Sequence, residues 1–289
     1  MNFFSVSSRG LLAGYCLLVL VASLAGGWFL LFIRPTHARL QIAISLVAGL
    51  MLGIALLHFL PDAAEQLHSV DRTAAWMLAG FLAMFFLQRF FHFHHHDSPE
   101  GDPEDCCHDH ETEAAGEPVR HAHTLADKSA QQLSWIGTVL GLTLHSLLDG
   151  LALAAAVAAG MQNHVRLAGL GVALVVILHK PFDAMAVTTL MTAGGSSRFL
   201  RHVLNAVFAL VTPLGAALFY FGANHFTDSS TVFLGGALAF CAGTFLCIAS
   251  SDLLPELQFH SHDRFKLSVA LLAGLAVAML IKQLETGLV

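Results

Sequence analysis

Two heptapeptides contain the residues of this chain best suited to chemistry. LHSLLDG contains His145 and Asp149, and LHKPFDA contains His179 and Asp183. In a helix, positions i and i+4 lie on one face, so the two members of each pair would point the same way. Two such helices packed face to face would present two imidazoles and two carboxylates to one point. Ligands of this kind and number suit Zn²⁺ and also Fe²⁺, Mn²⁺, Co²⁺ and Cd²⁺.

The chain is too apolar for an ordinary water-soluble domain of its length. Of its 289 residues, 56% are hydrophobic and 12% are charged, and the mean hydropathy is +0.68. A lipid bilayer is therefore the expected surrounding. The formal net charge of −6 argues against nucleic acid as a partner.

Eight apolar runs in the sequence approach or exceed the length of about 20 residues that crosses a bilayer as a helix. They cover residues 11–33, 40–62, 74–91, 134–160, 167–192, 203–222, 231–256 and 267–284. We therefore predict an all-α membrane protein with eight transmembrane helices. Its single membrane domain comprises helices one to three in residues 1–92, a disordered loop in residues 93–130, and helices four to eight in residues 131–289.

The distribution of Lys and Arg favours one orientation of these helices. The connections after helices one, three, five and seven contain nine such residues, whereas the opposite side contains four. Because short connections rich in Lys and Arg stay in the cytosol, we expect both termini outside and the long loop inside. The expected location is the plasma membrane, which in a bacterium is the inner membrane.

A second pair of matching segments indicates an internal repeat. HFLPD at residues 58–62 lies near the end of helix two, and DLLPE at residues 252–256 lies near the end of helix seven. If helices 1–3 and 6–8 are repeats around helices four and five, the paired helices cross the membrane in opposite directions. Inverted repeats of this kind are typical of secondary transporters, whose sites lie near the midplane.

This arrangement predicts a pathway with a central site and a cluster of charged residues at each mouth. The outer mouth would contain His58, Asp62 and Glu65, and the inner end would contain Asp252 and Glu256. At the centre, an ionised aspartate costs about 2.5–3.5 kcal/mol on insertion scales, and a bound dication would offset two of them. The alternative is a pair of buried His–Asp hydrogen bonds that only tie helices together. Lys180, one residue after His179, can pair with either central aspartate.

The loop between helices three and four carries further side chains that can bind metals. Its low hydrophobicity and high charge predict disorder when no metal is bound. We expect a weak, multivalent metal trap, and the alternative is a solvated linker. The candidate ligands are His94, His95, His96, Cys106, Cys107, His108, His110, His121 and His123.

As a set, these features resemble the ZIP (Zrt/Irt-like) family of divalent metal transporters over essentially the whole chain. The resemblance rests on the eight helices, the histidine-rich loop, the two central motifs, the Leu-Pro-acid segments and a Pro-Leu-Gly at residues 213–215. It implies that one metal site is formed by the four residues listed here: His145, Asp149, His179 and Asp183. It also implies an elevator-like motion of one helix bundle against another.

Three positions depart from the pattern of those family members that hold a second metal. These members place an Asn after the first central His, an acid after the second, and a Glu before the Pro-Leu-Gly. This chain has Ser146, Lys180 and Thr212 there. The ammonium of Lys180 can take the place of the second cation, so the resemblance implies one transported metal at the centre.

The sequence therefore predicts uptake of zinc, or of a related dication, into the cytosol by alternating access through one central site. Zn²⁺ would be the substrate, with no organic cofactor and no catalytic residue, and a homodimer is compatible with the sequence. The rival hypothesis is an intramembrane zinc-dependent hydrolase that uses the same His and Asp residues. Such an enzyme needs an open coordination position and a general base. Acidic clusters at both faces favour a permeating ion.

Overall fold

The computed structural model describes residues 6–32, 36–91, 125–193, 195–225, 230–259 and 264–287. The long segments of this part of the chain are helices. The helices are α1 (Val6–Phe32), α2 (His37–Gly53), η1 (Ile54–Phe59), α3 (Leu60–Leu67), α4 (Val70–Phe91), α5 (Leu125–Gln162), α6 (Leu170–Ala193), α7 (Arg198–His225), α8 (Ser230–Phe259) and α9 (Arg264–Gly287). Within the described residues, eight helical segments are long and apolar enough to cross a membrane. The predicted all-α fold with eight spans is confirmed.

Most helices extend beyond the predicted bounds of their spans, and two of these cases bear on the predictions. α5 begins at Leu125, so residues 125–130, which we predicted as loop, are helical. The segment LADKSAQQ that opens this helix contains no Gly or Pro and several good helix formers, so nothing local stops the helix there. The second span is a continuous rod of α2, η1 and α3 that runs on to Leu67, past its predicted end at residue 62.

The middle of that rod is a π-helix, and it contains a buried polar side chain. η1 ends two residues before Pro61, which has no backbone N–H to donate to the preceding turn. π-helical turns occur inside α-helices mainly as single turns, often at functional sites. In this turn His58 is buried, with 6% of its surface exposed.

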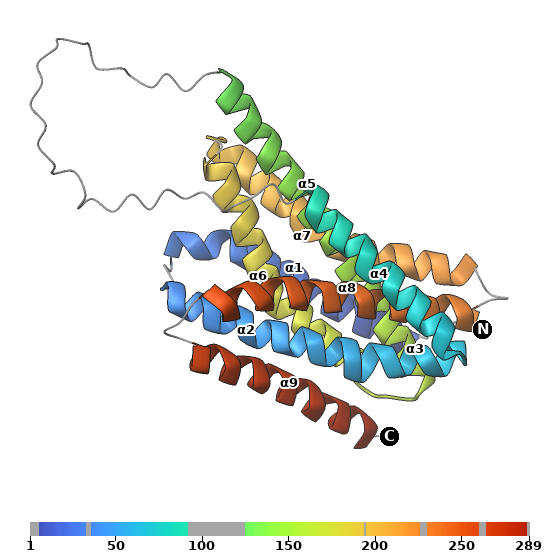
Figure 1. The fold of residues 1–289 in the computed structure, drawn as a ribbon. Helices are drawn as coiled ribbons and strands as arrows, with labels where there is room; N and C mark the ends of the chain where they lie inside the picture. The colour runs from blue at the N-terminus through green and yellow to red at the C-terminus, as the bar shows by residue number, and fades with distance from the viewer. Residues whose placement is uncertain are drawn as a thin grey trace, which may run out of the picture.

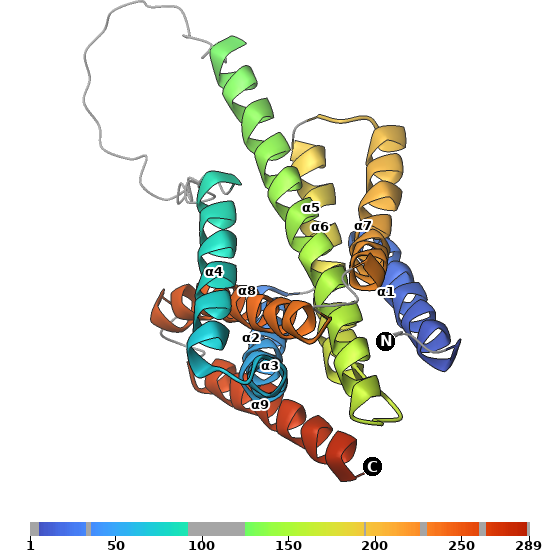
Figure 2. The same cartoon turned by 90° about the vertical axis from the view of Figure 1, so that its right-hand side faces the viewer.

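The helices form two bundles, which Figure 2 shows side by side. One bundle contains α1, α5, α6 and α7, and the other contains the α2–α3 rod, α4, α8 and α9. Between the bundles, α8 packs on α5 and α2 packs on α6. The site described below therefore lies where the bundles meet.

Glycines allow the helix backbones within a bundle to approach closely. A Cβ atom at Gly49 of α2 or Gly274 of α9 would collide with the backbone of the other helix. Gly80 of α4 and Gly243 of α8 have the same relationship. Small residues at such contacts are typical of helix packing in membranes. The inverted repeat predicts this equivalence, because it exchanges the second span with the seventh and the eighth with the third.

The two ends of the molecule are distinct (Figure 1). α4 ends and α5 begins at one end, which we call the loop end. α1 begins and α9 ends at the opposite end, which we call the terminal end. The predicted metal-binding residues of the long loop, at positions 94–123, all lie outside the described residues.

Candidate metal centre

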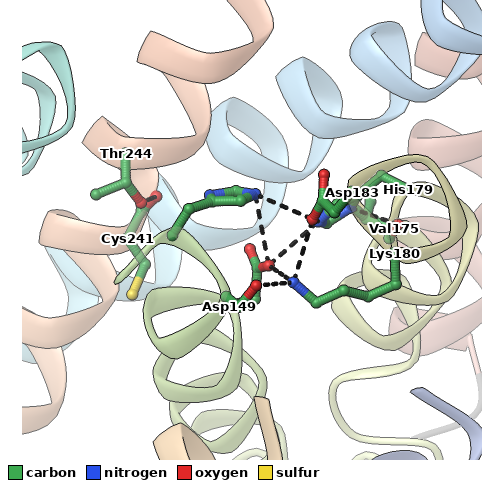
Figure 3. Close-up of polar contacts among 9 residues, drawn as sticks. Asp149, Val175, His179, Lys180, Asp183, Cys241 and Thr244 are labelled. Atoms are coloured by element: carbon green, nitrogen blue, oxygen red, sulfur yellow. Dashed lines mark hydrogen bonds and ion pairs between the residues drawn. The ribbon is translucent and has the colours of Figure 1, made fainter. Parts of the chain in front are cut away.

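Four side chains from α5 and α6 converge in the interior of the molecule (Figure 3). One ligand atom from each side chain can be chosen so that all four lie within 4.8 Å of one another. In the described ranges, this is the one group of three or more His, Cys, Asp or Glu residues with such an arrangement. Its members are the four residues that the two heptapeptides predicted: His145, Asp149, His179 and Asp183.

The distances within this group are close to those of a tetrahedral zinc site. Asp149 Oδ2 lies 3.6 Å from His145 Nε2 and 3.2 Å from His179 Nε2. Asp183 Oδ2 lies 3.8 Å from each of the same two nitrogens. Zn²⁺ binds such atoms at about 2.0–2.1 Å, which puts neighbouring ligands of a tetrahedron about 3.4 Å apart. These four His–Asp distances therefore suit a small dication, while all four ligand atoms lie within 4.8 Å of one another.

The backbone of α6 orients one of the two imidazoles. His179 Nδ1 donates a hydrogen bond to the carbonyl oxygen of Val175, one turn earlier, at 2.9 Å. With the proton on Nδ1, the lone pair of Nε2 faces the other three ligands, as is usual for metal-binding histidines. The backbone of α6 itself thus positions the imidazole of His179.

Two polar atoms of the site have no hydrogen-bond partner among the described residues. They are His145 Nδ1 and Asp149 Oδ1, and both are buried. Buried polar atoms are nearly always satisfied in folded proteins, and exceptions call for an explanation such as a function. Their presence here sets the centre apart from a hydrogen-bonded His–Asp pair that serves packing alone.

Lys180 lies beside both carboxylates. Its side chain is fully buried, and its Nζ donates to Asp149 Oδ2 at 2.7 Å and to Asp183 Oδ2 at 3.3 Å. A third hydrogen bond runs to Ser146 Oγ at 2.8 Å. The ammonium also lies 5.6 Å from the centre of the Phe208 ring. Sequence reasoning expected a pair with either aspartate, and the structure has both.

Two cavities connect the centre with the loop end. The first, of about 630 Å³, lies between α2 and α6 and is lined by His145, His179 and Asp183. The second, of about 910 Å³, lies between α4, α5 and α8 and is also lined by His145 and Asp183. Both cavities reach Ser251 of α8 on the way to the loop end. The centre is therefore accessible from that end.

The terminal end has a separate, smaller pocket that shares no lining residue with either of these cavities. Its volume is about 120 Å³, and it contains His58 and Asp62 from the predicted outer mouth. The third predicted residue, Glu65, is exposed and does not line the pocket. Phe59 of η1 and Phe245 of α8 are buried in the same bundle, with ring centres 5.4 Å apart. Among the described residues, the terminal pocket is thus separate from the two cavities that reach the centre.

Sequence reasoning missed two residues of this pocket, which come from the last helix. Glu285 Oε2 lies 3.1 Å from His58 Nδ1, and Lys282 Nζ donates to Asp62 Oδ1 at 3.2 Å. The other nitrogen of His58, Nε2, donates to the carbonyl oxygen of Ala278 at 3.1 Å. The available signal was the spacing of Lys282 and Glu285, three positions apart on one face of the eighth span.

At the loop end, the predicted inner residues Asp252 and Glu256 belong to α8, but their side chains lie outside the described part of the structure. Other polar residues of α8 line the second cavity there, and sequence reasoning did not single them out. They are Cys247, Ser250 and Ser251. Gln88 of α4 joins them, because its Nε2 donates to Ser251 Oγ at 3.0 Å and its Oε1 accepts from Cys247 Sγ at 3.6 Å.

Comparison with known proteins relates the whole arrangement to one family. Residues 10–282 match the family model described as ZIP Zinc transporter. The chain is 36% identical over 153 residues to Zinc transporter ZIP9-B of Xenopus laevis, a match covering 50% of this chain and 48% of that protein. It is 25% identical over 292 residues to Zinc transporter 3 of Arabidopsis thaliana, covering 91% of this chain and 81% of that protein.

The match to the Xenopus protein thus spans about half of that protein's length, whereas the family model spans nearly this whole chain. The matched range includes α5 and α6 with their four converging side chains. On this evidence the chain belongs to the ZIP zinc transporter family.

Proposed function

We propose that the protein carries a divalent metal ion, foremost Zn²⁺, across a membrane through the centre formed by His145, Asp149, His179 and Asp183. One observation carries the proposal: the four side chains meet inside the membrane-spanning part of the molecule, and two cavities lead to them from the loop end. A site near the midplane that is accessible from one side at a time is the basic requirement of alternating access.

The ligand chemistry suits transient binding. Structural zinc sites favour thiolates and closed coordination, whereas this group consists of imidazoles and carboxylates. The same ligands accept Fe²⁺, Mn²⁺, Co²⁺ and Cd²⁺, so we expect these ions to compete with zinc. The buried ammonium of Lys180 already lies between the two carboxylates, which supports a single transported metal at the centre.

The two bundles supply the moving parts of the proposed mechanism. Backbone contact at glycines makes each bundle compact, and the metal ligands belong to α5 and α6 of only one of them. A displacement of this bundle along α2 and α8 would close the loop-end cavities and join the centre to the terminal pocket. His58 and Asp62 would then attract cations at the outer mouth, and Asp252 and Glu256 would accept them at the inner end.

The direction of transport follows from the proposed orientation. If the loop end faces the cytosol, as the distribution of Lys and Arg predicts, the net movement is uptake. A membrane potential of 100 mV, negative inside, contributes about 2.3 kcal/mol per charge and thus about 4.6 kcal/mol for a dication. The histidines and cysteines of the long loop would then collect released ions on the cytosolic side.

Uptake of radioactive zinc into liposomes that contain the purified protein tests this function. We expect saturable uptake that is lost in His179→Ala and in Asp183→Ala. His164→Ala is the matched control, because His164 is exposed in the turn between α5 and α6 and lies outside the centre. If zinc binds at the centre but does not cross the membrane, and the variants lose only this binding, transport is refuted. The hydrolase hypothesis would then be favoured.

A further inference from the structure

Lys180 binds the same atoms that a metal ion would bind. Its Nζ contacts Asp149 Oδ2 at 2.7 Å and Asp183 Oδ2 at 3.3 Å. These are the two oxygens that lie nearest to the imidazole nitrogens of the centre. The ammonium and a dication therefore share the same two carboxylates, and full coordination of a metal requires the ammonium to weaken its hold on them.

The ammonium group is fully satisfied where it lies. A lysine ammonium has three donors, and Nζ has three acceptors, which are the two aspartates and Ser146 Oγ at 2.8 Å. The side chain reaches this position from the residue next to the ligand His179, so it travels with the centre whenever α6 moves. A cation of the protein itself thus accompanies the two carboxylates at every stage.

The ammonium of Lys180 lowers the net negative charge of the centre when no metal ion is bound. With neutral imidazoles and ionised carboxylates, the side chains alone carry −2, and Lys180 changes this to −1. A bound dication then brings the centre to +1. Without the lysine, the two values would be −2 and 0. Because the cost of moving a charge out of water rises with its square, an empty centre of charge −2 costs about four times as much as one of −1.

We propose that Lys180 is a built-in counter-ion, which lets the centre return across the membrane without a metal ion. This inference rests on the proposed transport function and adds the step that resets it. The lysine replaces the departed dication on both carboxylates, so the cycle needs no second metal ion on the way back. The next dication displaces the ammonium, which lowers the affinity and favours release.

The distinction between net uptake and exchange tests the inference in liposomes. Net uptake into zinc-free liposomes requires the empty centre to return, whereas exchange of external radioactive zinc for internal zinc does not. For Lys180→Met we expect the ratio of net uptake to exchange to fall about tenfold or more, because the two buried carboxylates lose their partner. Zinc affinity, measured by equilibrium dialysis, should rise about tenfold or more because a competing charge at close range is gone.

Two further variants make the result specific. Lys180→Arg keeps the positive charge and should restore most of the ratio. Lys266→Met is the matched control, because Lys266 is exposed at the start of α9 and lines neither cavity that reaches the centre, so the same substitution should leave the ratio unchanged. If Lys180→Met does not yield folded protein, Lys180→Gln offers a polar, uncharged side chain for the same measurement.

Three results would overturn the inference. Net uptake and exchange that fall in equal proportion, with unchanged zinc affinity, would assign Lys180 a purely structural role. A normal ratio in spite of tighter zinc binding would show that the empty centre returns without the lysine. Failure of both uptake and exchange in the unaltered protein would remove the proposed transport function itself and the counter-ion with it.

Discussion

Lys180 Nζ lies 2.7 Å from Asp149 Oδ2, the same oxygen that lies 3.2 Å from the Nε2 atom of His179. One carboxylate oxygen thus serves both the resident cation and a candidate metal ligand. Asp149 is almost completely buried, so its charge depends on these neighbours alone for compensation.

The contact should make Asp149 the most sensitive residue of the centre. Asp149→Asn removes the closest partner of a buried ammonium, and breaking a buried ion pair costs about 3–5 kcal/mol. Asp183→Asn should cost less, because the Asp183 side chain is 15% exposed and its oxygen lies farther from Nζ, at 3.3 Å. Thermal unfolding in detergent measures both changes.

A double-mutant cycle supplies the control for this first prediction. Asp149→Asn combined with Lys180→Met removes both charges, so the double variant should recover part of the stability lost in Asp149→Asn. If the stability loss of the double variant equals the sum of the losses in the two single variants, the two side chains do not stabilise each other.

The number of metals at the centre should depend on the three positions that differ from two-metal family members. The triple variant Ser146→Asn, Lys180→Glu, Thr212→Glu replaces one positive charge by two negative ones and adds a carboxamide ligand. We expect it to hold two ions where the natural sequence holds one. Anomalous scattering from crystals soaked in cadmium locates and counts them, and it separates the centre from the long loop.

Two ions at the centre of the natural sequence would contradict the single-metal proposal. The variant Thr212→Glu alone is a suitable control, because it adds a carboxylate but retains the ammonium of Lys180. It should still hold one ion.

The terminal pocket should influence how cations reach the centre rather than how they cross. Asp62→Asn removes the negative charge that accepts from Lys282 at 3.2 Å, so the pocket that also contains His58 and Glu285 becomes more positive. Cations should then be repelled, so the zinc concentration for half-maximal uptake should rise several-fold with little change in the maximal rate. Uptake measured over a range of zinc and salt concentrations tests this.

Glu65→Gln is the matched control at this end, because Glu65 is exposed on the same helix and does not line the pocket. A similar effect of both substitutions would indicate a general surface charge effect and no role for the pocket itself.

Close packing at glycines should make one methyl group costly inside a bundle. A Cβ atom at Gly243 of α8 would meet the carbonyl oxygen and the amide nitrogen of facing residues in α4. Gly243→Ala should therefore lower the stability by about 1–3 kcal/mol, the usual cost of overpacking. Gly14→Ala in α1 should be neutral or slightly stabilising, since no atom lies within 4 Å of the added methyl group.

Thermal unfolding of these two glycine variants is the measurement, and equal stabilities would contradict the packing role of Gly243. A stable Gly243→Ala protein that has lost uptake would further indicate that compactness of this bundle is needed for the motion between the bundles.

The sequence by itself determined the features that depend on short stretches of chain. Each span is recognisable because its length and apolarity must match a bilayer, and helical geometry aligns His145 with Asp149 and His179 with Asp183. The matching Leu-Pro-acid segments at residues 58–62 and 252–256 are likewise readable in short stretches of sequence. The exact helix ends could not be read, because the start of α5 at Leu125 depends on how far the helix continues beyond the apolar run.

Only the tertiary structure decided how residues far apart in the chain meet. His58 contacts Ala278 across 220 positions of sequence, and no local pattern of the second span indicates this contact. Lys282 and Glu285 belong to the terminal pocket because α9 packs against the α2–α3 rod. Access to the centre from the loop end depends on the relative position of two bundles. Packing between distant segments sets that position, because helix periodicity fixes which face a side chain is on but not which partner covers it.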